Sequence, residues 1–169
     1  MSAPPHVQAS GGPSRTGDRR VVARCAARPA DVRTALGRVM AGLAPHLGDC
    51  AGRTATELVL AEVLNNVVEH AHASDAPCAI RVEVRVREGR LDLSVSDDGR
   101  PMPGGRLPAG QFPSLAGPKA TLPEGGFGWP LIHSLARDVR YRRRYGRNEL
   151  RLALCLKAPG ATTAPKTPQ

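Results

Sequence analysis

Three polar side chains recur every four residues in one segment of predicted helix, namely Glu62, Asn66 and His70. Because a helix turns by about 100° per residue, this spacing places them in one stripe beside an apolar face that includes Val63 and Val67. Polar groups at such a border are costly without partners, and a bound phosphate with its metal would supply them. Asn66 offers an oxygen to a hard cation, and Glu62 can polarise a hydroxyl. The alternative interpretation is a solvated helix flank.

A pair of carboxylates ends the predicted strand that contains Leu91 and Val95. Asp97 has the same strand phase as these apolar residues, which predicts that it points toward the helix-facing side of the sheet, whereas Asp98 points away. An inward carboxylate needs a donor, and the exocyclic amine of adenine is one. In the alternative interpretation the strand ends one residue earlier, and both carboxylates belong to a turn at Gly99.

A glycine-rich turn precedes the third predicted helix. Its residues are Gly125, Gly126, Phe127 and Gly128. Glycines before a helix N-terminus let backbone N–H groups approach a phosphate closely, and the helix dipole favours the negative charge. A glycine-rich turn of this kind is more often an ordinary loop. Here a binding role is favoured by its position at the end of a long irregular segment.

Taken in order, these motifs resemble those of the GHKL superfamily, which includes gyrases, Hsp90 chaperones, histidine kinases and MutL proteins and has the Bergerat ATP-binding fold. The segment Glu62 to His70 resembles the N box, Asp97-x-Gly99 the first glycine box, and Gly126-x-Gly128 the second. The stretch Gly-Gly-Phe-Gly-Trp-Pro-Leu-Ile-His is most similar to the RsbW and SpoIIAB-like branch, whose members are serine kinases that also bind sigma factors.

This resemblance implies a role for each motif residue. Asn66 would bind Mg²⁺, Glu62 would act as general base, and Asp97 would contact the adenine of ATP. His70 would lie near the phosphates. The two glycine boxes would line the nucleotide through Gly99, Gly125, Gly126, Phe127 and Gly128.

The resemblance also implies an activity and partners. We expect a serine/threonine-protein kinase that uses Mg-ATP to phosphorylate a STAS-type anti-anti-sigma partner, and that binds a sigma factor when released from it. The alternative is a non-catalytic protein that holds ATP as a structural ligand and sequesters a regulatory partner. A sensor histidine kinase fits less well, because no helical hairpin with a phosphoacceptor histidine precedes the domain and His70 lies inside the N box.

The elements that must position these residues form an α+β two-layer sandwich, in which a mixed, mainly antiparallel sheet is covered on one face by three helices. Alternating apolar residues and helical apolar spacing locate the elements. The predicted strands are 19–26, 80–86, 91–95, 139–145 and 150–156, and the predicted helices are 29–43, 54–71 and 129–137. This domain covers residues 19–157, between disordered tails at 1–18 and 158–169.

Residues 99–128 have repeated Gly and Pro and little periodicity, which predicts a lid. Pro101 occupies a position where histidine kinases usually have a second glycine, so the hinge of the lid is expected to differ. Lys119 within the lid is a candidate phosphate contact.

The composition limits the class of protein. The 169 residues fit one domain, and the net charge of +9 favours acidic partners without choosing among nucleic acid, anionic lipid and protein. The four cysteines form no metal-binding or redox pair, and no apolar run could span a bilayer, so we expect a soluble cytoplasmic protein without a membrane partner. Dimerisation is left open.

Arginines 140, 142 and 144 alternate with apolar residues, which favours a solvated outer sheet face over specific nucleic-acid binding.

Overall fold

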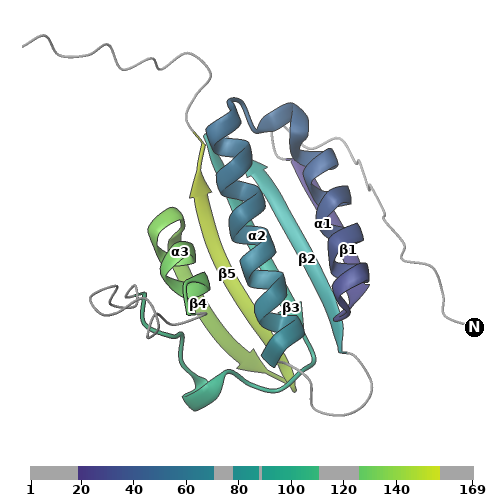
Figure 1. Cartoon of the computed structure of the whole chain (residues 1–169), viewed down its shortest axis with the longest axis vertical. Helices are drawn as coiled ribbons and strands as arrows, with labels where there is room; N and C mark the ends of the chain where they lie inside the picture. The colour runs from purple at the N-terminus through teal and green to yellow at the C-terminus, as the bar shows by residue number, and fades with distance from the viewer. Residues whose placement is uncertain (1–18, 71–77, 88, 111–125, 157–169) are drawn as a thin grey trace, which may run out of the picture.

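The chain folds into one antiparallel sheet with helices on one side (Figure 1). The computed structural model describes residues 19–70, 78–87, 89–110 and 126–156. Within them the elements follow the order β1 (Arg19–Ala26), α1 (Pro29–Leu43), η1 (Ala44–His46), α2 (Cys50–His70), β2 (Ala79–Arg87), β3 (Arg90–Asp97), η2 (Pro103–Gly105), α3 (Gly128–Leu135), β4 (Arg137–Arg144) and β5 (Arg147–Cys155). The predicted α+β sandwich is confirmed.

The strand order is β1-β2-β3-β5-β4, and every neighbouring pair in this sheet is antiparallel. A mixed sheet would also contain a parallel pair of strands, and the described strands form none, so this detail of the expectation was wrong. Two tight turns explain part of this result. Gly89 has a φ of +65° between β2 and β3, and Tyr145 and Gly146 have φ values of +50° and +75° between β4 and β5. Positive φ is typical of short hairpin turns, which join strands in antiparallel fashion.

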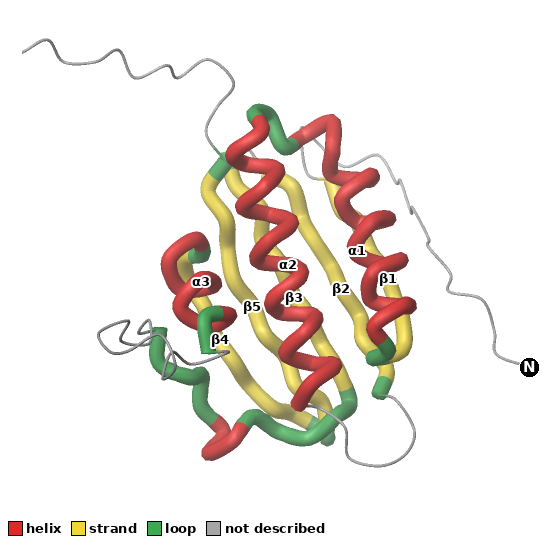
Figure 2. The backbone as a smooth tube through the Cα atoms, in the orientation of Figure 1, coloured by secondary structure: helices red, strands yellow, loops and turns green. Residues whose placement is uncertain are grey.

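The three helices pack against a single face of the sheet, and the other face is not covered by any of them (Figure 2). The core lies between the two layers. From β2 it takes Ile80, Val82 and Val84, and from α2 it takes Val59 and Leu60, all of which are essentially inaccessible to solvent. The strict alternation of β2 therefore turns its arginines to the uncovered face.

Several element boundaries differ from the expectation. Helix α2 begins at Cys50 rather than Thr54, because the Asp49 carboxylate accepts a 2.8 Å hydrogen bond from the Gly52 N–H and caps the helix. Helix α3 ends at Leu135, and β4 begins at once at Arg137. The predicted end of that helix at residue 137 was wrong, because the backbone already becomes extended at Ala136, with φ −101° and ψ 157°. The β4–β5 register is irregular between Arg137 and Arg140, where Asp138 has a φ of +53°.

The predicted lid is described only in part. Residues 99–110 and 126–128 are placed, and the first of these segments includes the short helix η2. Lys119 and Gly125 lie outside the described residues, as do both predicted tails. None of the described helices combines the length and the apolar composition that a membrane span requires.

Candidate functional site

A cavity of about 440 Å³ lies between α2, the ends of β3 and β5, and the segment that follows β3. This volume is within the range of small-molecule sites. Its apolar walls come from Val63, Val67, Val95, Met102 and Leu150. The polar groups that face it include Asn66, His70, Asp97 and Asn148. Residues from the predicted N box and first glycine box thus meet at one hollow.

Asp97 is the buried carboxylate of this cavity, with 7% of its surface exposed. Its Oδ1 atom accepts hydrogen bonds from Asn148 Nδ2 at 2.7 Å and from the Gly99 N–H at 2.9 Å. Its Oδ2 atom has no hydrogen bond to any described residue, so one oxygen remains able to accept from a ligand. Burial raises the pKa of Asp97 above its ordinary value, although the bonds from Asn148 and Gly99 oppose the shift.

The inward orientation of Asp97 follows from strand phase as predicted. Its neighbour Asp98 is exposed, and its Oδ1 atom accepts a 2.7 Å hydrogen bond from the Ala79 N–H at the start of β2. Asp98 therefore joins two strand ends and does not line the cavity. The contact of Asp97 with adenine stays a prediction.

Asn148 also lines the cavity, and the sequence analysis did not include it among the candidate site residues. Its Nδ2 donates to Asp97 Oδ1 and to the Arg100 carbonyl, each at 2.7 Å, while its Oδ1 accepts from Arg143 Nη1 at 2.7 Å and from the Tyr141 hydroxyl at 2.8 Å. All hydrogen-bonding positions of this buried amide are used. Because a guanidinium only donates and a carboxylate only accepts, the amide has a single satisfactory orientation.

The same network holds the segment after β3 in place. Arg143 Nη1 also donates to the Gly99 carbonyl at 2.8 Å, and the Tyr141 hydroxyl accepts from the Met102 N–H at 3.1 Å. The β4–β5 hairpin thereby fixes the first glycine box and the cavity wall at Met102. A signal for this role was present, because Arg143 shares the strand phase of Val139 and Tyr141 rather than that of the outward arginines.

Asn66 lines the cavity and has one unpaired polar atom. Its Nδ2 atom is buried and has no hydrogen-bond partner among the described residues. An unsatisfied buried amide costs about 1–3 kcal/mol, so a polar ligand in the cavity would relieve this penalty. His70, one turn later on α2, lies at the rim with 68% of its side chain exposed and its Nε2 atom 3.8 Å from Glu69 Oε2.

Glu62 lies at the contact between α2 and α3, next to the cavity rather than in its wall. A Cβ built on Gly128 would lie 2.6 Å from Glu62 Oε2 and 3.9 Å from Asn66 Nδ2. Only a glycine leaves room for this approach of the second glycine box to the N box.

The other residues of the second glycine box stand apart from the cavity. Gly126 has a φ of +86°, a conformation that favours glycine. Phe127 is 39% exposed and, like Gly99, does not line the cavity. Phe127 and Gly99 are therefore not part of the cavity wall, and their roles toward a nucleotide stay predictions.

The residues present fit an adenine nucleotide. The apolar walls suit the faces of a base, the free oxygen of Asp97 suits an exocyclic amine, and the unpaired amide of Asn66 lies on the same cavity. The described residues contain no group of three or more His, Cys, Asp or Glu side chains that could hold a metal by itself. A magnesium ion would therefore depend on Asn66 Oδ1 together with phosphate and water oxygens, because Mg²⁺ usually keeps several waters and binds substrate phosphates.

Comparison with known proteins found one family and one group of solved structures that resemble the chain. The profile of the histidine kinase-like ATPase domain family matches residues 25–154, well over half of the chain. Among solved structures, the chain is similar to the blue-light activated histidine kinase of Erythrobacter litoralis EL346, with 23% sequence identity and a TM-score of 0.43. That similarity covers 62% of this chain and only 30% of the kinase chain. No curated protein matches the sequence.

Proposed function

The chain belongs to the histidine kinase-like ATPase family, and we propose that it binds Mg-ATP in the cavity beside α2 and transfers the terminal phosphoryl group to a serine of a partner protein. The observation that carries the proposal is the Asp97 carboxylate, which is buried at the cavity wall. One of its oxygens is held by Asn148 and Gly99, and the other has no hydrogen bond to any residue that the structure describes. A fixed, water-shielded acceptor of this kind discriminates between ligands that present a donor and ligands that do not.

Each group of the site has a part in this proposal. Asp97 accepts the adenine amine, and the apolar walls exclude water from the base. Asn66 would hold Mg²⁺, which would neutralise the charge of the phosphates. Glu62 accepts the proton of the serine hydroxyl while the serine oxygen forms a bond to the terminal phosphorus of ATP. The bond from that phosphorus to ADP breaks, and ADP leaves. Phosphoryl transfer depends mainly on such positioning and charge neutralisation.

The partner class rests on the resemblance of the second glycine box and the following helix to the RsbW and SpoIIAB-like branch. We propose a STAS-type protein as the phosphorylated partner, and a sigma factor as the protein bound in its absence. Transfer of radiolabelled phosphate from ATP to purified STAS proteins tests the activity. Retained transfer by Glu62→Gln would refute the assignment of Glu62 as general base.

One observation favours a second candidate, a non-catalytic ATP-binding protein that sequesters its partner. Glu62 packs against Gly128 instead of lining the cavity, so the proposed base is separated from the space in which a nucleotide would lie. A wild-type protein that binds ATP and its partner but transfers no label would favour this candidate over the kinase.

The binding step has a sharper test. Asp97→Asn keeps the size of the side chain but replaces one acceptor oxygen with a donor, so it should weaken ATP binding by about tenfold or more, as expected for a lost discriminating hydrogen bond. The matched control is Asp98→Asn, which can still accept from the Ala79 N–H. Calorimetric titration with ATP measures both variants. Equal affinities for the two variants would contradict the assignment of Asp97.

A further inference from the structure

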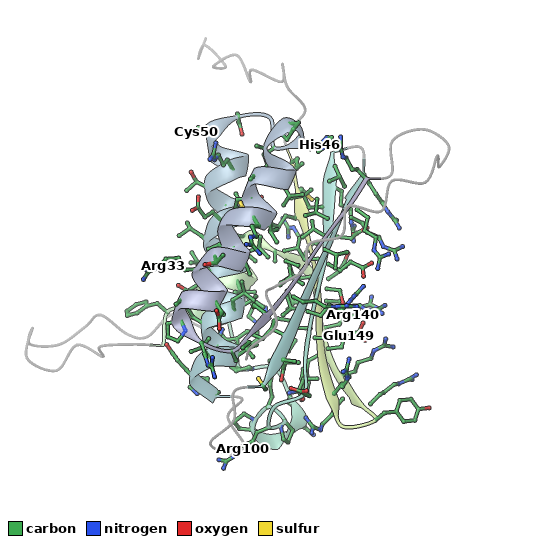
Figure 3. All side chains as sticks on the ribbon, turned by 90° about the vertical axis from the view of Figure 1, so that its right-hand side faces the viewer. Arg33, His46, Cys50, Arg100, Arg140 and Glu149 are labelled. Carbon is green, nitrogen blue, oxygen red and sulfur yellow. The ribbon has the colours of Figure 1, made fainter. Side chains whose placement is uncertain are left out.

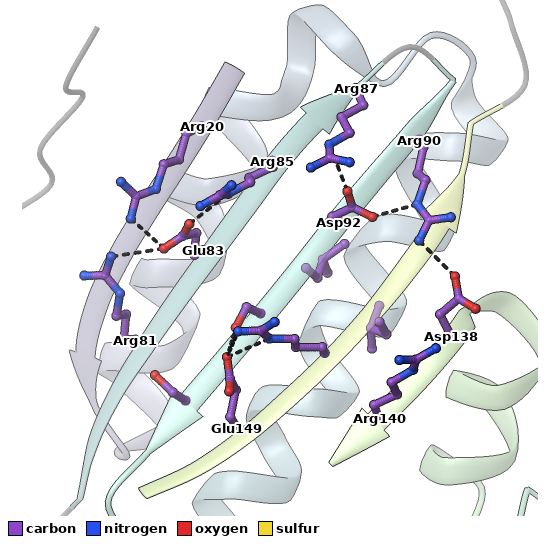
Figure 4. A pocket seen from close by; sticks show the side chains of 15 residues that line it. Arg20, Arg81, Glu83, Arg85, Arg87, Arg90, Asp92, Asp138, Arg140 and Glu149 are labelled. Atoms are coloured by element: carbon purple, nitrogen blue, oxygen red, sulfur yellow. Dashed lines mark hydrogen bonds and ion pairs between the residues drawn. The ribbon is translucent and has the colours of Figure 1, made fainter. Parts of the chain in front are cut away.

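The sheet face opposite the helices contains a second hollow, of about 670 Å³ (Figure 4). It is lined by seven arginines and four carboxylates from all five strands. Figure 3 shows two of these residues, Arg140 and Glu149, projecting from the sheet on the side away from the helices, whereas Arg33 lies on the helical side. We call this outward surface around Glu83, Asp92 and Glu149 the arginine face.

The register of the strands produces this arrangement. Outward residues of neighbouring strands stand directly opposite each other, as with Arg24 and Arg81, Arg20 and Arg85, and Arg140 and Arg151. Like charges in opposite positions are normally destabilising. The sheet tolerates them because a few carboxylates lie between the guanidinium groups.

Each central carboxylate is shared by more than one arginine. Glu83 contacts Arg20 at 2.6 Å and both Arg81 and Arg85 at 3.1 Å. The hydrogen bond from Arg20 is the main reason that the pKa of Glu83 falls to about 2, so this group stays ionised.

Asp92 and Glu149 repeat the pattern. Asp92 contacts Arg90 at 2.6 Å and Arg87 at 3.2 Å. Glu149 contacts Arg151 at 2.6 Å and also pairs with Arg142. Arg90 also contacts Asp138, at 2.9 Å. Four carboxylates thus serve seven arginines, which leaves a local excess of positive charge.

Further arginines on this face have no carboxylate partner in the described part of the chain. Arg140 lines the hollow without an ion pair, and Arg24 and Arg144 share its outward phase. Their guanidinium groups remain able to bind carboxylates supplied from outside.

We propose that the arginine face binds an acidic segment of a partner polypeptide. Charge complementarity selects this occupant, and the geometry already present is that of guanidinium groups converging on carboxylates. The described residues that line the hollow include no aromatic side chain on which a base could stack, and the apolar ones are limited to Leu93 and Leu152, too few to insert into a membrane. A second copy of this face carries the same excess charge and would be repelled. Because the sheet separates it from the cavity at Asp97, this site is independent of the proposed ATP binding.

The test uses a fluorescein-labelled peptide of alternating Glu and Asp, about 20 residues long as in one side of a common interface. Fluorescence anisotropy at low salt measures its affinity for the full chain. The variant is Arg140→Glu/Arg144→Glu, which breaks no ion pair of the described residues. The control is Arg33→Glu/Arg53→Glu, an equal charge change at exposed positions on α1 and α2.

The double reversal on the arginine face should weaken peptide binding by about tenfold or more, while the helical control should change it by less than about twofold. Equal losses in both variants, or no peptide binding by the wild type, would overturn the proposal. A duplex DNA or anionic vesicles bound more tightly than the peptide would also overturn it. Unchanged ATP affinity in both variants would show that neither effect arises from misfolding.

Discussion

The side-chain amide of Asn148 donates a 2.7 Å hydrogen bond from Nδ2 to Oδ1 of Asp97, joining the start of β5 to the end of β3. The two residues are opposite each other in the strand register and both are buried. Because this bond and the Gly99 N–H engage only Oδ1, they orient the carboxylate and leave Oδ2 without a bond to the described part of the chain.

Replacement of Asn148 by leucine should therefore destabilise the protein. The change leaves Asp97 Oδ1, the Tyr141 hydroxyl and the Arg143 guanidinium without a shared partner, at an expected cost of about 2–3 kcal/mol in the free energy of unfolding. Urea denaturation measures the loss. Asn65→Leu, at an exposed position of α2, is the control and should change the free energy by about 0.5 kcal/mol or less. Similar losses in both variants would remove the special role of Asn148.

Gly128→Ala should separate stability from activity. Its Cβ would lie 2.6 Å from Glu62 Oε2, and the flexible end of Glu62 can move away, so the free energy of unfolding should change by about 1 kcal/mol or less. Displacement of Glu62 should nevertheless lower phosphoryl transfer by about tenfold or more. Gly37→Ala, which meets no atom within 4 Å, is the control and should leave transfer unchanged. Normal transfer by Gly128→Ala would show that the position of Glu62 is unimportant.

As the pH is lowered, the affinity for ATP should begin to fall at a higher pH than it would if Asp97 had the pKa of an ordinary aspartate. Burial raises the pKa of Asp97, so the carboxylate that accepts the adenine amine becomes protonated earlier as pH decreases. The raised pKa also means that the native state holds this proton more tightly, so the contribution of Asp97 to stability decreases as pH rises through that range. Calorimetry at a series of pH values measures the first effect. In Asp97→Asn this part of the pH dependence should vanish.

Glu83 should affect the pH dependence of stability in the sense opposite to Asp97, because its pKa is lowered rather than raised. Its pKa is lowered from 4.5 to about 2, chiefly by the hydrogen bond from Arg20, so its stabilising effect is complete above the unfolded-state value and is lost as pH falls from 4.5 toward 2. Glu83→Gln should therefore lower stability at neutral pH and flatten the decline of stability with acid. Urea unfolding at several pH values tests this, with the exposed Glu57→Gln as the comparison. An unchanged acid slope in Glu83→Gln would contradict the prediction.

The four thiols should react in two classes. All are free, and Cys50 and Cys155 are exposed, whereas burial is the main cause that raises the pKa of Cys25 and Cys78 to about 11. Since the thiolate is the reactive form, an alkylating reagent at neutral pH should modify the exposed pair first. Peptide mass spectrometry after timed labelling identifies the order. Equal rates at all four positions would mean that Cys25 and Cys78 are more accessible than the structure indicates.

The sequence pattern alone predicted the elements and several orientations within them. The alternation of Ile80, Val82 and Val84 identified a half-buried strand, and the same period of two placed Asp97 inward and Asp98 outward. These predictions succeed because side-chain direction in a strand is a local property of the backbone. The capped start of α2 at Asp49 was missed, since the capping bond depends on the conformation of the turn before the helix.

Contacts between distant segments were decided only by the tertiary structure. The bonds of Asn148 to Asp97 and Arg100, and the approach of Gly128 to Glu62, join residues that no local pattern connects. The purely antiparallel pairing and the sharing of Glu83 by three arginines likewise depend on which strands become neighbours. The sequence determined which residue types face each side of an element, because that follows from backbone periodicity. Their partners were determined only by packing the helices on the sheet, because burial of the common core sets the register in which those faces meet.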